Sequence, residues 1–113
     1  MTETHVYKLL TADDWKTACE LGVTATGIDE ADGYVHLSTR AQAAETARLH
    51  FSGKGPVRLL RFDIGDLPEL TWEASRGGQM FPHLYAPLEV SLAEAVWLLV
   101  PDADGAPQMP EEY

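Results

Sequence analysis

The sequence predicts a small α+β domain, and three features of the chain lead to this fold class. Both helical segments fall in the first half of the 113 residues, most strand-like segments fall in the second half, and neither a repeat nor a linker divides the chain. Early helices and late strands favour an α+β fold over a doubly wound parallel sheet. The 45% apolar content suffices for one hydrophobic core without a metal or a disulfide. We therefore expect a single domain over residues 1–113, packed over about 5–100 and ending in a loose acidic tail at 101–113.

The chain begins with a predicted strand and a predicted helix. Residues 5–10 ("HVYKLL") are rich in β-branched and aromatic side chains, as strands are. Thr11 and Asp14 then form a Ser/Thr-x-x-acid helix start, which predicts a helix over 12–21 that stops at a glycine. The stretch 22–33 has no apolar periodicity, so we expect a loop there. A loop of this length is more often functional than a short connection.

A second strand and a second helix are predicted next. Residues 34–38 ("YVHLS") form a short strand that runs directly into a helix start. Thr39 is the expected N-cap of that helix, and Gln42 occupies the reciprocal position of a capping box. The helix is expected to reach Phe51 and to stop at Gly53. Alanines dominate its apolar stripe, which allows it to lie close to a sheet.

The second half of the chain is predicted to be mostly strand. Residues 56–64 alternate between two faces, and 70–74 form a shorter strand. The segment 75–85 is rich in glycine and contains a proline, so we expect it to be irregular. A buried strand is expected over 95–100, where an apolar run is stopped by Pro101.

Charge and cysteine content narrow the classes of partner. The net charge is −10, from 8 Lys and Arg against 18 Asp and Glu, and the chain has no basic run. Nucleic acids and anionic membrane surfaces are bound mainly through clustered cations, so neither is an expected partner. One cysteine cannot form an internal disulfide, and no signal peptide or apolar stretch of membrane-spanning length is present. We expect a cytoplasmic protein, a monomer or weak homodimer, with a small-molecule ligand.

The second predicted strand separates an apolar face from a polar one. Val35 and Leu37 point to one side and must face the core, so Tyr34, His36 and Ser38 face a cleft or solvent. A Tyr–His–Ser row can donate hydrogen bonds, accept them and stack on a flat ligand. The alternative is an exposed strand face with incidental polar residues.

A second group of polar residues lies in the segment 71–85 ("TWEASRGGQMFPHLY"). Glu73, Arg76, His83 and Tyr85 occur there within about a dozen residues, beside a glycine pair that permits close approach of the backbone. Loops held by a rigid sheet are where binding groups concentrate. The alternative is a surface hairpin whose Glu and Arg form a weak exposed ion pair.

Other kinds of chemistry have weaker support. His36, His83 and Glu73 show no metal-ligand spacing, so we expect no metal site, and a metal-dependent hydrolase that uses the two histidines stays an alternative. Ser38 lacks the G-x-S-x-G nucleophile motif. Neither a G-x-G-x-x-G motif nor a P-loop occurs, so a Rossmann domain and an NTPase are not supported.

Several of these segments, taken together, resemble a known family. "VYKLL", "DGYVHLST" followed by "AETA", "WE" and "GGQMFPHLYAPL" occur in the order found in the bacterial family called domain of unknown function 952, which has no established activity. The resemblance covers about residues 5–100. It implies a fold similar to the ADP-ribosyltransferases, with a split, bent, mostly antiparallel sheet and a cleft that binds NAD or ADP-ribose-like ligands.

The resemblance also implies a nucleotide-type pocket that transfers or cleaves an ADP-ribosyl group, with NAD as the candidate substrate and no other cofactor. In this hypothesis tyrosine stacks on the nicotinamide, histidine and serine hold the ribose, a cation neutralises phosphate, and a late glutamate (Glu73 or Glu89) stabilises the oxocarbenium-like transition state. The alternative is a non-catalytic ligand-binding or interaction domain on the same fold. The catalytic candidates are His36, Glu73 and His83, and the ligand-binding candidates are Lys8, Tyr34, Ser38, Thr39, Arg76 and Tyr85.

Overall fold

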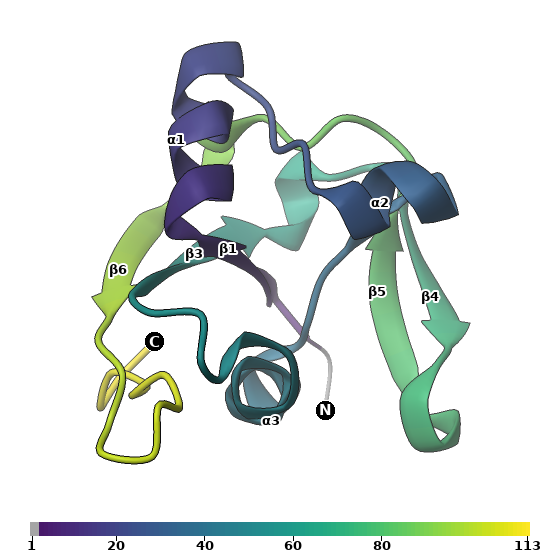
Figure 1. Ribbon diagram of the computed structural model, residues 1–113. Coiled ribbons are helices and arrows are strands. Elements are labelled where there is room, and N and C mark those ends of the chain that lie inside the picture. The colour runs from purple at the N-terminus through teal and green to yellow at the C-terminus, as the bar shows by residue number, and fades with distance from the viewer. Residues whose placement is uncertain (1–2) are drawn as a thin grey trace.

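Two three-stranded antiparallel sheets, with strand orders β1-β3-β6 and β2-β5-β4, form the framework of the computed structural model (Figure 1). The structure describes residues 3–113, apart from the side chain of Arg76. The strands are β1 (His5–Thr11), β2 (Val35–His36), β3 (Val57–Asp63), β4 (Leu70–Ala74), β5 (Met80–Leu84) and β6 (Ala95–Leu99), and the α-helices are α1 (Ala12–Leu21), α2 (Gly27–Asp32) and α3 (Arg40–Phe51). Short 3₁₀ turns occur at Ile64–Asp66, Arg76–Gly78 and Val90–Leu92.

The α+β class is confirmed and the strand pairs are antiparallel as predicted, but the helices differ from the prediction. The strands form two sheets that meet at an isolated bridge, where Tyr7 N–H donates to Ser38 O (2.8 Å) and Ser38 N–H donates to Tyr7 O (2.9 Å). The segment 22–33, expected as a loop, contains the helix α2. Thr26 Oγ1 caps this helix by accepting from Asp29 N–H, and Gly33 ends it at φ 82°. A helix of six residues is too short to show apolar periodicity.

The segment 75–85 is also more regular than predicted, because its second half is the central strand of the β2-β5-β4 sheet. Its proline explains the error, since a residue without N–H argues against a central strand. Pro82 nevertheless lies within β5, opposite Trp72, and its carbonyl accepts from Leu37 N–H on the other side (3.1 Å). The strand therefore keeps the bond that the Pro82 carbonyl accepts and lacks the reciprocal bond that an N–H at this position would donate to Leu37.

Alternation along β1 sends its side chains into two cores on opposite faces of the β1-β3-β6 sheet. Val6 and Leu10 pack in the core that includes Ala18 of α1, whereas Tyr7 and Leu9 pack in the core that includes the alanines of α3. The two helices lie on opposite sides of this sheet (Figure 1). Lys8 lies between Val6 and Leu10 in the strand, so its side chain points to the α1 side.

The segment 101–113 packs against the domain, so the expectation of a loose tail is wrong. Pro101 and Pro107 form a β-bridge, and Met109 and Tyr113 pack against the core on the α3 side. The Tyr113 ring meets Tyr7 edge to face at 5.6 Å. Apolar and aromatic side chains spaced among the acidic residues thus hold the segment in place.

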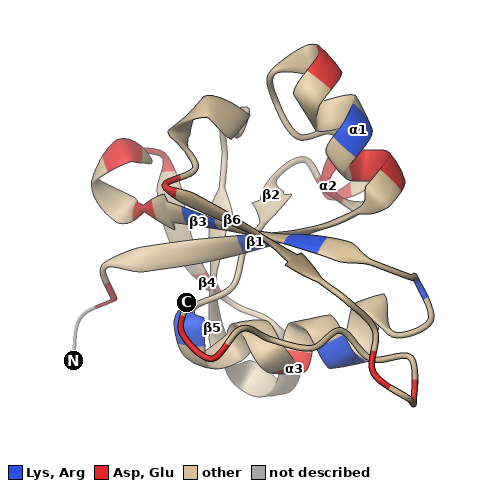
Figure 2. Ribbon diagram, turned by 90° about the vertical axis from the view of Figure 1, so that its left-hand side faces the viewer, with Lys and Arg blue, Asp and Glu red and all other residues tan. Residues whose placement is uncertain are grey.

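Acidic residues lie on α2 and several turns, Lys and Arg lie on several strands, and both α1 and α3 carry residues of both signs (Figure 2). No helix in the described part of the chain is long and apolar enough to cross a lipid bilayer.

Candidate functional site

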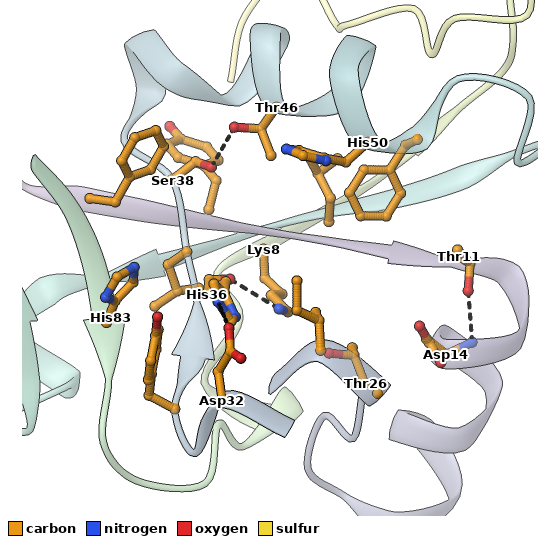
Figure 3. Close-up of a pocket in the computed structure, with 18 of the residues that line it drawn as sticks. Lys8, Thr11, Asp14, Thr26, Asp32, His36, Ser38, Thr46, His50 and His83 are labelled. Atoms are coloured by element: carbon orange, nitrogen blue, oxygen red, sulfur yellow. Dashed lines mark hydrogen bonds and ion pairs between the residues drawn. The ribbon is translucent and has the colours of Figure 1, made fainter. Parts of the chain in front are cut away.

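A cavity of about 750 Å³ lies beside β1, between α3 and α2 (Figure 3). Such a volume falls within the range of pockets that hold small organic ligands. Its walls include five of the residues predicted from sequence: Lys8, Tyr34, His36, Ser38 and His83. The two polar segments of the sequence therefore open onto one cavity.

Two of the histidines in the cavity wall, His36 and His83, are neighbours across the β2–β5 pair. His36 lies opposite His83 in the register of the two strands, and their ring centroids are 5.5 Å apart. The Tyr34 ring lies against both imidazoles, with centroid distances of 4.6 Å to His36 and 4.2 Å to His83. Because strand pairing fixes both backbones, the spacing of the rings is set by the sheet.

Carboxylates contact both ring nitrogens of His36. Nδ1 lies 2.6 Å from Asp29 Oδ1, which also accepts from His36 N–H at 3.0 Å. Nε2 lies 2.9 Å from Asp32 Oδ2, in the last turn of α2. A neutral imidazole has one N–H, so only the doubly protonated ring can donate to both carboxylates at once.

Asp29 is in turn held by a buried lysine. Lys8 Nζ donates to Asp29 Oδ2 at 2.7 Å and to the carbonyl of His36 at 3.0 Å, and the side chains of Lys8 and Asp29 are only 5% and 7% exposed. Burial alone would raise the pKa of Asp29, but the charge of Lys8 and hydrogen bonds from Lys8 and His36 hold it below its ordinary value. Burial lowers the pKa of Lys8, against the attraction of Asp29. Although Lys8 lines the cavity, its ammonium is engaged within the protein.

Glu73 and Tyr85 support His83 from outside the cavity wall. Glu73 Oε1 lies 2.8 Å from His83 Nδ1 and accepts from the hydroxyl of Tyr85 at 2.7 Å. Hydrogen bonds from Tyr85 and His83 lower the pKa of Glu73, and the bond to Glu73 raises the pKa of Tyr85 to about 12. Neither Glu73 nor Tyr85 is among the cavity-lining residues. With Nδ1 engaged, Nε2 is the nitrogen through which His83 can serve a ligand.

Comparison with known proteins identifies the family of the chain. Residues 9–96 match the family model described as "Protein of unknown function (DUF952)". The chain belongs to the DUF952 family. The resemblance seen in "HLST" and "FPHLY" is thereby confirmed at the level of the family.

Two solved structures of another protein are similar to this DUF952 chain over nearly its whole length. The crystal structure of protein CC0527 from Caulobacter crescentus superposes with a TM-score of 0.87 at 45% identity, and covers 93% of this chain and 94% of that one. The solution NMR structure of CC0527 gives a TM-score of 0.77 at 44% identity, with 92% and 91% covered. A comparison with curated proteins found no match.

Ser38, already placed in the cavity wall, and the two remaining candidates from the sequence differ in their surroundings in this DUF952 structure. Ser38 is buried in the cavity wall, and its Oγ donates to Thr46 Oγ1 at 3.1 Å. Thr39 is not among the lining residues, and its hydroxyl accepts from Gln42 N–H at 3.2 Å and caps α3. The side chain of Arg76 lies outside the described residues.

We expect Thr39→Ala to lower the free energy of unfolding by about 1 kcal/mol, because it removes the N-cap of α3. Affinity for any ligand of the cavity should stay unchanged, since the hydroxyl is engaged in the capping box. Urea denaturation and ligand titration of the same variant test both points. Thr39→Ser is the matched control, because serine also caps helices and should restore the stability. A loss of affinity in Thr39→Ala without a loss of stability would return Thr39 to the ligand-binding set.

A second expectation concerns the ionisation of Tyr85. Glu73→Gln should lower the pKa of Tyr85 from about 12 toward the ordinary tyrosine value near 10, because a neutral amide replaces the carboxylate that disfavours the phenolate. A raised pKa favours the protonated phenol in the folded protein. The contribution of Tyr85 to stability is therefore complete below about pH 10 and is lost as the pH rises toward 12.

The measurement is a pH titration of the tyrosine ring carbons by NMR. Glu20→Gln, an exposed change on α1, is the control and should leave the Tyr85 titration where it was. If Tyr85 titrates at the same pH in Glu73→Gln and in the wild type, the hydrogen bond between the two side chains does not control the phenol.

The two carboxylates beside His36 and several residues on the α3 side of the cavity were not predicted from the sequence. Asp29 and Asp32 lie in the segment 22–33, which was expected to be a functional loop. The length of that segment could have indicated that its carboxylates belong to the site. Thr46, His50 and Lys54 line the cavity from α3 and the turn after it. Thr46, His50 and Lys54 are four positions apart in the sequence, a spacing that places helical residues on one face. This spacing could have indicated them as a group.

The closest grouping of candidate metal ligands lies away from the cavity. Among the described residues, His5, Asp63 and Glu94 form the one group of three whose donor atoms lie within 4.8 Å of one another. Glu94 also accepts from Arg61 Nε at 3.3 Å, and Asp63 accepts from the backbone of Gly65. The alternative of a metal-dependent hydrolase built on His36 and His83 therefore gains no third ligand from the described residues.

Proposed function

We propose that this DUF952 protein binds NAD or a related ADP-ribosyl compound in the cavity and cleaves or transfers its ADP-ribosyl group. The observation that carries the proposal is the pairing of His36 with His83 on adjacent strands, beneath Tyr34, in the wall of a ligand-sized cavity. The two antiparallel sheets that meet at one bridge also suit the split-sheet, ADP-ribosyltransferase-like fold implied by the family resemblance.

The cavity wall offers groups that suit the parts of such a ligand. The Tyr34 ring can stack on a flat nicotinamide or adenine. The Ser38 hydroxyl and the free ring nitrogen of His83 can hydrogen-bond the hydroxyls of a ribose. Lys54 lines the cavity beyond α3 and supplies a cation for phosphate, in place of the internally paired Lys8.

The proposed reaction breaks the N-glycosidic bond of NAD. The electron pair of that bond passes to the nicotinamide nitrogen, which becomes neutral, and the ribosyl carbon acquires oxocarbenium character. Water or another hydroxyl acceptor adds to this carbon and gives its proton to His83 Nε2. Asp32, in the cavity wall, and Glu73, acting through His83, place fixed negative charge near the developing cation.

Calorimetric titration with NAD and ADP-ribose tests the binding step. We expect binding in the micromolar range, weakened about tenfold or more by His36→Ala, which is a loss of about 1.4 kcal/mol. His5→Ala is the matched control, because His5 does not line the cavity. Binding no tighter than millimolar, or binding that is unchanged by His36→Ala, would reject the proposal.

A non-catalytic ligand-binding domain is the second candidate, and one observation favours it. Glu73 and Glu89, the glutamates considered for stabilising a ribosyl cation, do not line the cavity. Glu73 is also engaged by His83 and Tyr85. A binder would be stabilised against heat by ADP-ribose without releasing nicotinamide from NAD, whereas the enzyme would release it.

A further inference from the structure

The hydrogen bonds around His36 show how this residue is held. β2 is an edge strand, and its pairing with β5 uses the backbone groups of Val35 and Leu37. The N–H and C=O of His36 therefore point to the open edge. There Asp29 Oδ1 accepts from His36 N–H at 3.0 Å, and Lys8 Nζ donates to the His36 carbonyl at 3.0 Å. Two side chains thus take the place of a neighbouring strand.

The same carboxylate also requires a proton on Nδ1 of the His36 ring. Asp29 Oδ1 lies 2.6 Å from Nδ1, and an ionised carboxylate can only accept, so Nδ1 must carry a hydrogen. Lys8, at 2.7 Å from Asp29 Oδ2, keeps the carboxylate charged in its buried position. The other nitrogen, Nε2, lies 2.9 Å from Oδ2 of Asp32, a half-exposed residue that lines the cavity.

We propose that Asp29 is the positioning residue of the site: it fixes the ring of His36 with its Nδ1 proton turned inward and its Nε2 on the cavity side, beside Asp32. Asp29 itself is not among the lining residues, so it acts through His36 and does not touch the ligand. The inference deepens the proposed function and rests on it in one respect, namely that His36 meets the ligand. Lys8 contributes to the same positioning, because it contacts both Asp29 and the carbonyl of His36.

Proton and nitrogen NMR of the histidine rings tests the proposal without any ligand. In the wild type we expect the His36 Nδ1 proton far downfield, as a short, charge-assisted hydrogen bond requires. In Asp29→Asn this resonance should move upfield or disappear, because an amide is a weaker acceptor than a carboxylate. Asp32→Asn is the matched control, since Asp32 faces Nε2, and it should leave the Nδ1 resonance in place.

A second variant guards against loss of the fold in Asp29→Asn, which leaves Lys8 without its counter-charge. Lys8→Met/Asp29→Asn removes both charges and should show the same upfield shift of the Nδ1 proton. The proposal is overturned if the wild-type ring carries its proton on Nε2 alone, or if the Nδ1 resonance stays in place in the folded variants. Failure to bind NAD would reject the proposed function alone, because these spectra report the free protein.

Discussion

Lys8→Met is expected to lower the free energy of unfolding by about 3–5 kcal/mol, because it leaves a buried carboxylate without its counter-charge. Both members of the ion pair are almost fully buried, and their charged atoms are 2.7 Å apart. The loss should be largest near neutral pH, where Asp29 is ionised. Since the pKa of Asp29 is lowered in the folded protein, the stability that its charge provides is present above about pH 4 and is lost as the pH falls further.

Urea denaturation at pH 7 measures this effect. The double variant Lys8→Met/Asp29→Asn should recover most of the loss, because neither buried charge remains and the amide oxygen can still accept from His36. Lys16→Met, on the exposed face of α1, is the control and should change stability by less than about 0.5 kcal/mol. If the single variant at Lys8 loses no more than this control, the ion pair does not support the fold.

His83→Gln is expected to reduce nicotinamide release from NAD by about 10²- to 10⁴-fold, the usual contribution of a general acid or base. Glutamine can still form hydrogen bonds in the cavity, but it cannot take up a proton at neutral pH. The affinity for ADP-ribose should therefore change much less than the turnover. Chromatographic detection of nicotinamide at saturating NAD measures the rate, and calorimetry measures the affinity.

The control for His83 is His50→Gln, because His50 lines the same cavity from α3. Its turnover should stay within about threefold of the wild type, because the proposed reaction passes no proton through His50. Equal losses in both variants would assign the effect to the cavity in general and not to proton transfer at His83. Release of nicotinamide by neither the wild type nor any variant would leave the binding domain as the function.

Local signals in the sequence predicted much of the fold. Thr11 and Thr39 cap helices as expected, and the face of Tyr34, His36 and Ser38 lies on the cavity as the alternation of the strand predicts. These features depend on residues within four positions of one another, where backbone geometry alone sets the outcome. The pairing of the two histidine segments could not be derived from local patterns, because it depends on which strands are neighbours in the sheet. The register of β2 and β5 shows that His36 lies opposite His83.

The features that were missed depend on contacts between distant residues. Lys8 and Asp29 are 21 positions apart, and nothing near Lys8 in the sequence signals that its ammonium is buried in an ion pair. The strand β5 was missed because proline is unfavourable in a central strand, and the bond that the Pro82 carbonyl accepts from Leu37 of β2 depends on a distant segment. Tyr113 packs on Tyr7, at the other end of the chain, so its order could not be seen from the composition of the last residues.

The exchange of the Tyr7 and Ser38 amides with solvent deuterium should depend on whether the cavity is occupied. Both residues line the cavity, and their reciprocal backbone hydrogen bonds are the point where the sheets are joined. Transient separation of the sheets would expose these two amides to solvent deuterium before the interior of either sheet. Their exchange rates, followed one residue at a time, should therefore slow when the cavity is filled, whatever the filling molecule is.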